Sequence, residues 1–257
     1  MKFGEIIVIT VLCTCALVSA QSKEPVRAEL NGLRVLIDPD SGGLLELEYG
    51  GVKMLKSAPG NASLLDAAYP GHGFEPLRLG TRYSKDARVE IADGGISITW
   101  QTLGMSRAFE AKGSVTATVQ IRPTADGRSV SFNASIENKS GLEIPQVLFP
   151  DLDGLQPFAG LDGTELRTCG GVQKPFRDLF LAEDEGRWYA SRRNWQTLKS
   201  GAYDKSMAAR WLDMGSLQGG FSLFPELWSW GPLTESGEPT TDRVLLHLSQ
   251  TDRTLRL

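Results

Sequence analysis

Tryptophan side chains gather in one part of this 257-residue sequence. Five of the six tryptophans lie between positions 188 and 230, beside a pair of arginines. Indole rings pack on the C–H faces of sugars and guanidinium groups donate hydrogen bonds to hydroxyls, so this combination suits a glycan-binding groove. It would also suit a surface on which another domain docks. The residues assigned to this surface are Trp188, Trp195, Trp228, Trp230, Arg192 and Arg193, whereas Trp100 and Trp211 are expected in the core.

The sequence contains two histidines, His72 and His247. His72 lies in the stretch 70–74 (PGHGF), a flexible loop that would place its imidazole beside a ligand, so we add it to the predicted carbohydrate-binding residues. A histidine that is simply solvated in this loop is the favoured alternative. His247 follows two leucines in an expected strand, where a place on the polar face is favoured over catalysis. Opening a sugar ring needs a general base and a general acid on opposite sides of the ring, commonly a carboxylate and a histidine, and neither histidine is assigned to this role.

Hydrolysis of a glycosidic bond requires two carboxyl groups about 5 to 9 Å apart. Asp151 and Asp153 are two residues apart, and we interpret them as a solvated strand face or as turn caps. The spacing singles out no pair among the other candidates, which are Asp162, Glu165, Glu183, Asp184, Glu185 and Glu226. The sequence therefore leaves any catalytic residues unknown.

Motifs for metal, redox, nucleotide and serine-esterase chemistry are absent. The sequence contains no HExxH, CxxC, phosphate-loop or GxSxG pattern. The segment 38–42 (DPDSG) carries two acids but lacks the other oxygen ligands of a calcium loop, so we interpret it as a turn. We expect no cofactor and no metal.

The elements that must position these residues are strands. Apolar and polar residues alternate over 45–55, 89–100 and 115–136, and each of these stretches is interrupted by a Gly-containing turn. A period of two with tight turns predicts hairpins, and the alternation puts one face of each strand in a core and the other in water. The sequence predicts an all-β fold, a large antiparallel β-sandwich.

The composition is that of a globular protein. Hydrophobic residues make up 41% and charged residues 23%, and the net charge is -4. Without a basic block to neutralise phosphates, nucleic acid is not expected as a partner. No linker-like stretch divides the chain, so we predict a single domain over residues 21–257.

The first twenty residues have the pattern of a secretory signal peptide. Residues 6–20 (IIVITVLCTCALVSA) are uncharged and end in small residues, which predicts cleavage after Ala20 and a secreted or periplasmic protein. Retention as a membrane anchor is the alternative. Later segments are too polar to span a membrane, so we expect no membrane association after cleavage. Cleavage would also remove Cys13 and Cys15 and leave Cys169 without a disulfide partner.

Parts of the strand pattern resemble the galactose mutarotase-like family. The stretch 33–47 (LRVLIDPDSGGLLEL) looks like the opening hairpin of these domains. The stretches 144–155 (IPQVLFPDLDGL) and 211–223 (WLDMGSLQGGFSL) resemble later strands of the same sandwich, as it occurs at the N-terminus of bacterial glycoside hydrolases. The resemblance implies a mutarotase-like supersandwich linked to carbohydrate metabolism.

We interpret the chain as the noncatalytic, carbohydrate-associated N-terminal part of a polysaccharide-degrading glycoside hydrolase. Its expected partner is an oligo- or polysaccharide. The sequence stops inside the alternating stretch 244–257, so we expect the sandwich to be truncated and a C-terminal catalytic domain to be missing. One alternative is an enzyme, either an aldose epimerase or a hydrolase acting on a sugar. Another is a structural module that docks on the missing domain.

Overall fold

The computed structural model describes residues 23–69, 77–107, 113–127, 129–144, 146–168, 173–184, 187–190, 212–216, 219–227 and 240–249. Nearly all regular structure in these ranges is β-strand. Helix is confined there to the short turns α1 (Gly160–Gly163), α2 (Phe176–Leu179) and the 3-10 turn η1 (Thr81–Tyr83). The described ranges contain no helix with the length and hydropathy of a membrane span.

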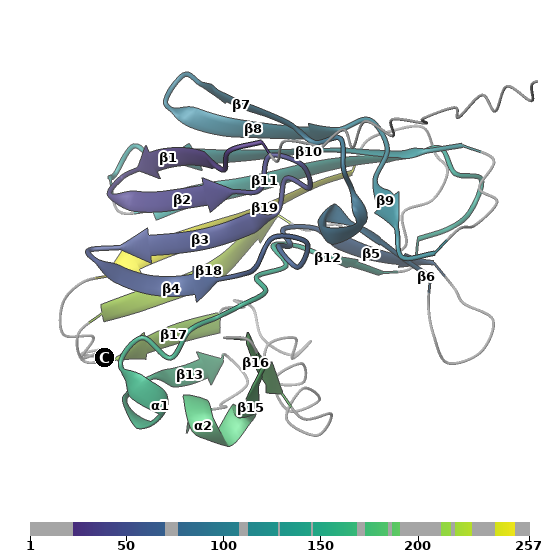
Figure 1. Cartoon of the computed structure of the whole chain (residues 1–257). Coiled ribbons are helices and arrows are strands. Elements are labelled where there is room, and N and C mark those ends of the chain that lie inside the picture. Colours follow the sequence, from purple (N-terminus) through teal and green to yellow (C-terminus); the bar gives the residue numbers. More distant parts are fainter. Residues whose placement is uncertain are drawn as a thin grey trace, which may run out of the picture.

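The largest sheet has nine antiparallel strands. In spatial order they are β14 (Gln173–Pro175), β13 (Glu165–Thr168), β17 (Leu212–Ser216), β18 (Gly219–Leu227), β19 (Thr240–Ser249), β11 (Ser129–Asn138), β10 (Val115–Pro123), β8 (Gly95–Trp100) and β7 (Arg88–Ala92). The order departs from the chain order at β19, which lies between β18 and β11. This sheet forms one whole layer of the molecule (Figure 1).

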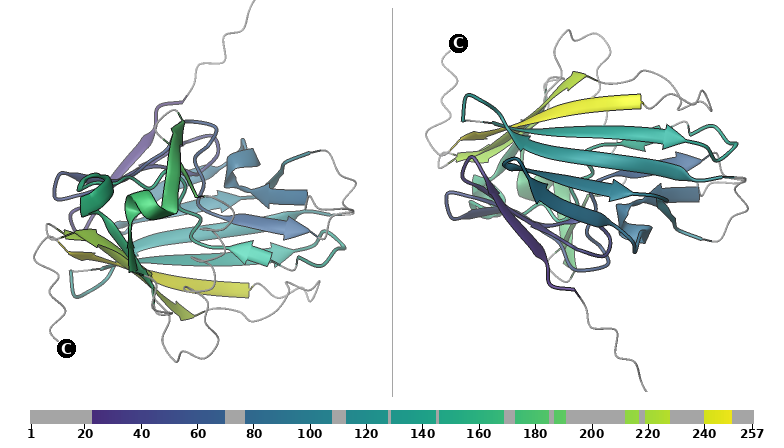
Figure 2. Two further views of the ribbon diagram at one scale, coloured as in Figure 1. Left: turned by 90° about the horizontal axis from the view of Figure 1, so that it is seen from below. Right: turned by 90° about the horizontal axis from the view of Figure 1, so that it is seen from above.

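Two four-stranded antiparallel sheets form the facing layer. One has the order β1 (Val26–Leu30), β2 (Leu33–Ile37), β3 (Leu44–Tyr49) and β4 (Val52–Lys56). The other has the order β12 (Gln146–Leu148), β5 (Asp66–Tyr69), β6 (Leu77–Gly80) and β9 (Gly104–Met105). A separate hairpin pairs β15 (Phe180–Asp184) with β16 (Arg187–Ala190). Figure 2 shows the two small sheets lying over the nine-stranded sheet, which confirms the predicted antiparallel sandwich.

Tight turns join the strands where the sequence predicts them. Gly50 and Gly51 both have positive φ between β3 and β4, and so do Asp93 and Gly94 between β7 and β8. Two central residues at positive φ give the turn that matches the twist of antiparallel strands. In the predicted turn at 38–42, the Asp38 carboxylate accepts a 3.0 Å bond from the Ser41 hydroxyl. The interpretation of this stretch as a turn is confirmed.

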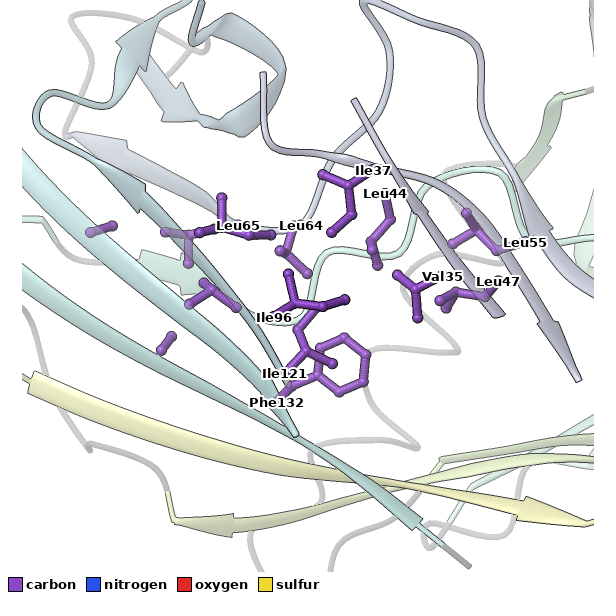
Figure 3. Packing of buried hydrophobic residues seen from close by; sticks show 14 of the residues in the cluster. Val35, Ile37, Leu44, Leu47, Leu55, Leu64, Leu65, Ile96, Ile121 and Phe132 are labelled. Carbon is purple, nitrogen blue, oxygen red and sulfur yellow. The ribbon is translucent and has the colours of Figure 1, made fainter. Parts of the chain in front are cut away.

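The core lies between the two layers. Figure 3 shows Val35, Leu44 and Leu55 of the first small sheet pointing toward Ile121 and Phe132 of the nine-stranded sheet. All five side chains are almost completely buried, as alternation at these positions requires. The facing layers therefore share one hydrophobic core.

Trp100 belongs to this core, as the sequence predicts. It is 1% exposed, and its indole Nε1 donates a 2.7 Å bond to the Ser41 carbonyl of the turn before β3. The adjacent Gly42 has φ +74, and a Cβ there would lie 2.6 Å from the Trp100 ring. A side chain at this position would clash, so glycine is required where the turn packs on the indole.

The segment after β12 bonds to both small sheets. The Asp151 amide donates to the Leu64 carbonyl beside β5 at 2.8 Å. On the other side, the Lys56 amide of β4 donates to the Gly154 carbonyl at 2.8 Å, and the Gln156 amide donates to Met54 at 2.9 Å. Residues 151–156 thus connect the two sheets through backbone bonds that the strand pattern does not predict.

Candidate functional site

Six polar side chains meet on the outer face of the small sheet that contains β5 and β6. They form the Arg82 cluster, which consists of Ser63, Asp66, Arg78, Arg82, Asp151 and Asp153. Alternation explains why β5 and β6 present this face. Ala67 pairs with Leu79 toward the core, which leaves Asp66 and Arg78 on the opposite side of the sheet.

Arg82 lies at the centre of the cluster. It follows β6 in η1, and its Nη2 donates a 3.0 Å bond to Asp151 Oδ2, while Nη1 lies 3.9 Å from Asp153 Oδ2. Asp151 Oδ2 also accepts a 2.6 Å bond from the hydroxyl of Ser63, which is 1% exposed. Charge-assisted bonds of this kind are roughly twice as strong as neutral ones, so the guanidinium is held in one orientation.

Asp66 is the buried acid of the cluster. Its side chain is 4% exposed, and Oδ2 accepts a 2.5 Å bond from Arg78 Nη1, whereas Oδ1 has no hydrogen-bond partner among the described residues. Burial raises the pKa of Asp66 above its ordinary value, and the attraction of Arg78 only partly offsets this effect. The negative charge of Asp151 raises the pKa of Asp66 further. The folded protein therefore disfavours the ionised form of this side chain.

Arg82 shows the opposite balance. Burial would lower its pKa, but the attraction of Asp151 and Asp153 outweighs burial and raises the pKa of Arg82 above its ordinary value. The guanidinium consequently stays charged, and its attraction to both carboxylates is retained over the whole physiological pH range.

The cluster is only partly open to solvent. Arg78 is 42% exposed, and Arg82, Asp151 and Asp153 are each between 21% and 24% exposed. These side chains present fixed donors and acceptors at the surface, which is the pattern that recognises hydroxyl groups, since a hydroxyl both donates and accepts. Asp151 and Asp153 approach the same guanidinium, and the acid with the raised pKa is buried. This arrangement suits binding better than proton transfer.

Metal binding has no support in the described ranges. No group of three or more His, Cys, Asp or Glu side chains there has the geometry to hold an ion. The carboxylates of the Arg82 cluster are instead neutralised by arginines.

The residues predicted from the sequence to bind carbohydrate are placed only in part. The backbone of Trp188 lies in β16, opposite that of Glu183 in β15. The other six lie outside the described residues: His72, Arg192, Arg193, Trp195, Trp228 and Trp230. The carbohydrate-binding surface made of these residues stays a prediction.

His247 occupies an interior strand of the nine-stranded sheet. In β19 it pairs with Ser129 of β11 on one side and with Ser222 of β18 on the other. The strand expected at this position is therefore present. Trp211, the other tryptophan expected in the core, lies outside the described residues.

One interpretation of the carboxylates needs correction. Asp151 and Asp153 do not lie on a strand, and neither carboxylate is freely solvated, because both approach Arg82. Sequence reasoning also missed Asp66, Arg78 and Arg82. A usable signal was present, since Asp66 interrupts the otherwise apolar stretch 64–69 (LLDAAY), and an acid in such a stretch needs a buried partner.

Comparison with known proteins gives structural neighbours alone. No protein-family model and no curated protein matches the chain. A galactose mutarotase-like protein from Clostridium acetobutylicum matches with a TM-score of 0.47 and 10% identity, covering 88% of this chain and 95% of that one. Galactose 1-epimerase from Lactobacillus acidophilus NCFM matches with a TM-score of 0.46 and 10% identity, covering 86% and 92%.

A galactose mutarotase related enzyme from Lactobacillus acidophilus is also similar, with a TM-score of 0.45 and 10% identity over 91% of this chain and 100% of that one. The chain therefore has mutarotase-like structural neighbours, of the kind that the sequence resemblance names. The assignment as an antiparallel sandwich rests on the sheets themselves.

Proposed function

We propose that this chain is a noncatalytic, carbohydrate-associated β-sandwich of a secreted polysaccharide-degrading protein. The observation that carries the proposal is the Arg82 cluster, where arginine and aspartate side chains are fixed against one another at a partly exposed surface. Fixed polar groups lose little conformational entropy on binding, which favours recognition of a polyhydroxyl ligand. The glycoside hydrolase context remains the implication of the sequence resemblance.

Arg78 is the side chain of the cluster best placed to contact a sugar. One of its Nη atoms is bonded to the buried Asp66, and 42% of the side chain remains exposed. The carboxylate below therefore sets the direction of the guanidinium, and the remaining N–H groups are available to sugar hydroxyls.

The noncatalytic role is supported by the state of the acids in the Arg82 cluster. A general acid for glycosidic chemistry combines a raised pKa with access to the leaving oxygen. Asp66 has the raised pKa but is buried, and the more exposed Asp151 is bonded to Ser63 and Arg82. The tryptophan surface predicted from the sequence would form a second contact region for the same glycan.

The proposal is tested by glycan binding to matched arginine variants. Arg78→Gln should weaken binding of a glycan-array ligand about tenfold or more, since one charge-assisted bond contributes about 1.5 to 3 kcal/mol. Arg34→Gln is the matched control, because Arg34 is also exposed and bonds to the largely buried Glu48, but on the other small sheet. Its affinity should equal that of the parent.

Polarimetry decides between binding and catalysis. The parent should not accelerate the mutarotation of freshly dissolved glucose or galactose above the buffer rate. An acceleration that is lost in Arg78→Gln would replace the noncatalytic proposal by the epimerase alternative. If the parent binds no glycan and does not accelerate mutarotation, both the carbohydrate-binding proposal and the epimerase alternative are wrong.

A further inference from the structure

In the three larger sheets of the described part of the molecule, most edges are protected against pairing with another chain. At one end of the nine-stranded sheet, β14 carries Lys174 and Pro175, residue types that block edge pairing. In the small sheets, β9 and β12 are only two and three residues long, and β4 is bonded along its outer side to residues 154–156. In these three sheets, two five-residue edges, β1 and β7, lack these protections.

The sequence of β1 is complementary to itself. It reads Val-Arg-Ala-Glu-Leu over residues 26–30, with Arg27 and Glu29 exposed and the apolar residues toward the core. When two copies of this strand pair antiparallel about Ala28, Arg27 lies opposite Glu29 of the second copy, and Glu29 lies opposite Arg27. On the core side, Val26 meets Leu30 of the second copy. Charge and apolar faces therefore match over the whole strand.

The backbone supports the same register. Asn31 and Gly32, both with positive φ, form the two-residue turn between β1 and β2, so the flanking pair Leu30 and Leu33 exchanges both backbone hydrogen bonds. Bonded and non-bonded pairs then alternate along β1, which directs the N–H and C=O groups of Arg27 and Glu29 to the open side. Pairing about Ala28 joins these outward groups in two bonded pairs.

We propose that β1 is the interface of a two-fold symmetric dimer of this chain. The four-stranded sheets of two copies would join into one continuous eight-stranded sheet with Ala28 on the axis. Figure 1 shows β1 at the outer edge of its sheet, with β2, β3 and β4 on its other side. Because a five-residue strand pairing buries little area, the dimer is expected to be concentration-dependent rather than permanent.

Strand β7, the other unprotected edge, is less complementary to a second copy of itself than β1 is. In β7, the turn at Asp93 and Gly94 directs the backbone groups of Val89 and Ile91 outward. A register that joins these groups in two bonded pairs places Glu90 opposite Glu90 of the second copy, which is a direct repulsion. Strand β7 therefore supplies a matched control, with Arg88 and Glu90 at the same spacing as Arg27 and Glu29.

The test uses charge exchange in the whole chain, followed by sedimentation velocity between about 1 and 500 µM. The parent should dimerise as its concentration rises. Arg27→Glu alone and Glu29→Arg alone should each weaken the dimer about tenfold or more, since like charges then face each other twice. An equimolar mixture of the two variants should restore the parent affinity, because every cross-strand pair again has opposite charges. Arg88→Glu should dimerise like the parent.

Thermal melts verify that each variant folds, as expected for exposed side chains. If a single variant does not fold, the double variant Arg27→Glu with Glu29→Arg replaces it, since it restores opposite charges in the same register and should dimerise. A monomeric parent over the whole range would overturn the proposal. So would a mixture that associates no better than its components, or an equal loss in Arg88→Glu.

Discussion

Asp66 shows how a single side chain can oppose folding at neutral pH. One of its oxygens is bonded to Arg78, and the other has no partner within the described ranges. Since burial raises its pKa, the folded state holds the proton more tightly than the unfolded state does. The stability of the parent consequently falls as pH rises from the ordinary aspartate pKa through the raised one.

Replacing Asp66 by Asn should remove this dependence. The stability of Asp66→Asn relative to the parent is expected to increase as pH rises from about 3 to about 7, because only in the parent does the unfolded chain release a proton that the folded chain holds more tightly. Urea unfolding at several pH values measures the difference. A stability difference that is constant with pH, or one that decreases, would show that the carboxyl ionises freely in the folded protein.

Residue types alone could not have located the Arg82 cluster. Asp66, Arg82 and Asp151 come from three separate parts of the chain. The bond of Arg82 to Asp151, and the effect of the Asp151 charge on Asp66, depend on the path of the segment after β12. The sequence pointed instead to tryptophans at 188–230, because aromatic clustering is visible without knowledge of the fold. Residues that lie close together in the sequence can be grouped without knowledge of the fold, whereas contacts between distant segments cannot be predicted in this way.

At the scale of elements, the hairpins were predictable and the connecting segment was not. A strand pair joined by a short turn is specified by alternation and by residues at positive φ, as at Asp93 and Gly94. Residues 151–156 have no such period. Their conformation follows from backbone hydrogen bonds to two different sheets. The Asp151 amide donates to the Leu64 carbonyl at one end, and the Gln156 amide donates to the Met54 carbonyl at the other.

Gly154 is the residue that lets this segment lie against β4. It has φ +87, and a Cβ there would lie 2.2 Å from the Lys56 carbonyl oxygen. Gly154→Ala should lower the free energy of unfolding by roughly 3 to 5 kcal/mol, adding a backbone clash to the cost of the left-handed conformation. Gly127→Ala has a similar φ of +70 with no atom within 4 Å of the added Cβ, and should cost only about 1 to 2 kcal/mol.

Urea unfolding of the two glycine variants separates the clash from the conformational cost. Equal destabilisation of Gly154→Ala and Gly127→Ala would mean that β4 moves away from residues 151–156 without loss. The connection between the two small sheets would then contribute little to stability.

At the scale of the whole molecule, the fold class followed from the period of two, but the strand order did not. Alternation gives each strand one inward face and says nothing about which strands are neighbours. The predicted leader over residues 1–20 lies outside the described residues. Intact-mass measurement of secreted material should give a chain that begins at Gln21, and a mass that retains residues 1–20 would indicate a membrane anchor instead.

The position of β19 in the nine-stranded sheet has a consequence for biosynthesis. Ile136 of β11 pairs with Thr240 of β19, and β19 also bonds to β18 on its other side. Residues 115–138, which form the hairpin of β10 and β11, are therefore synthesised well before the strand that covers the open edge of β11. A hairpin that forms before β19 is available exposes a ten-residue strand edge to pairing with other chains. A chaperone that shields β11 until Ser249 has been synthesised would protect the largest sheet at its most vulnerable stage.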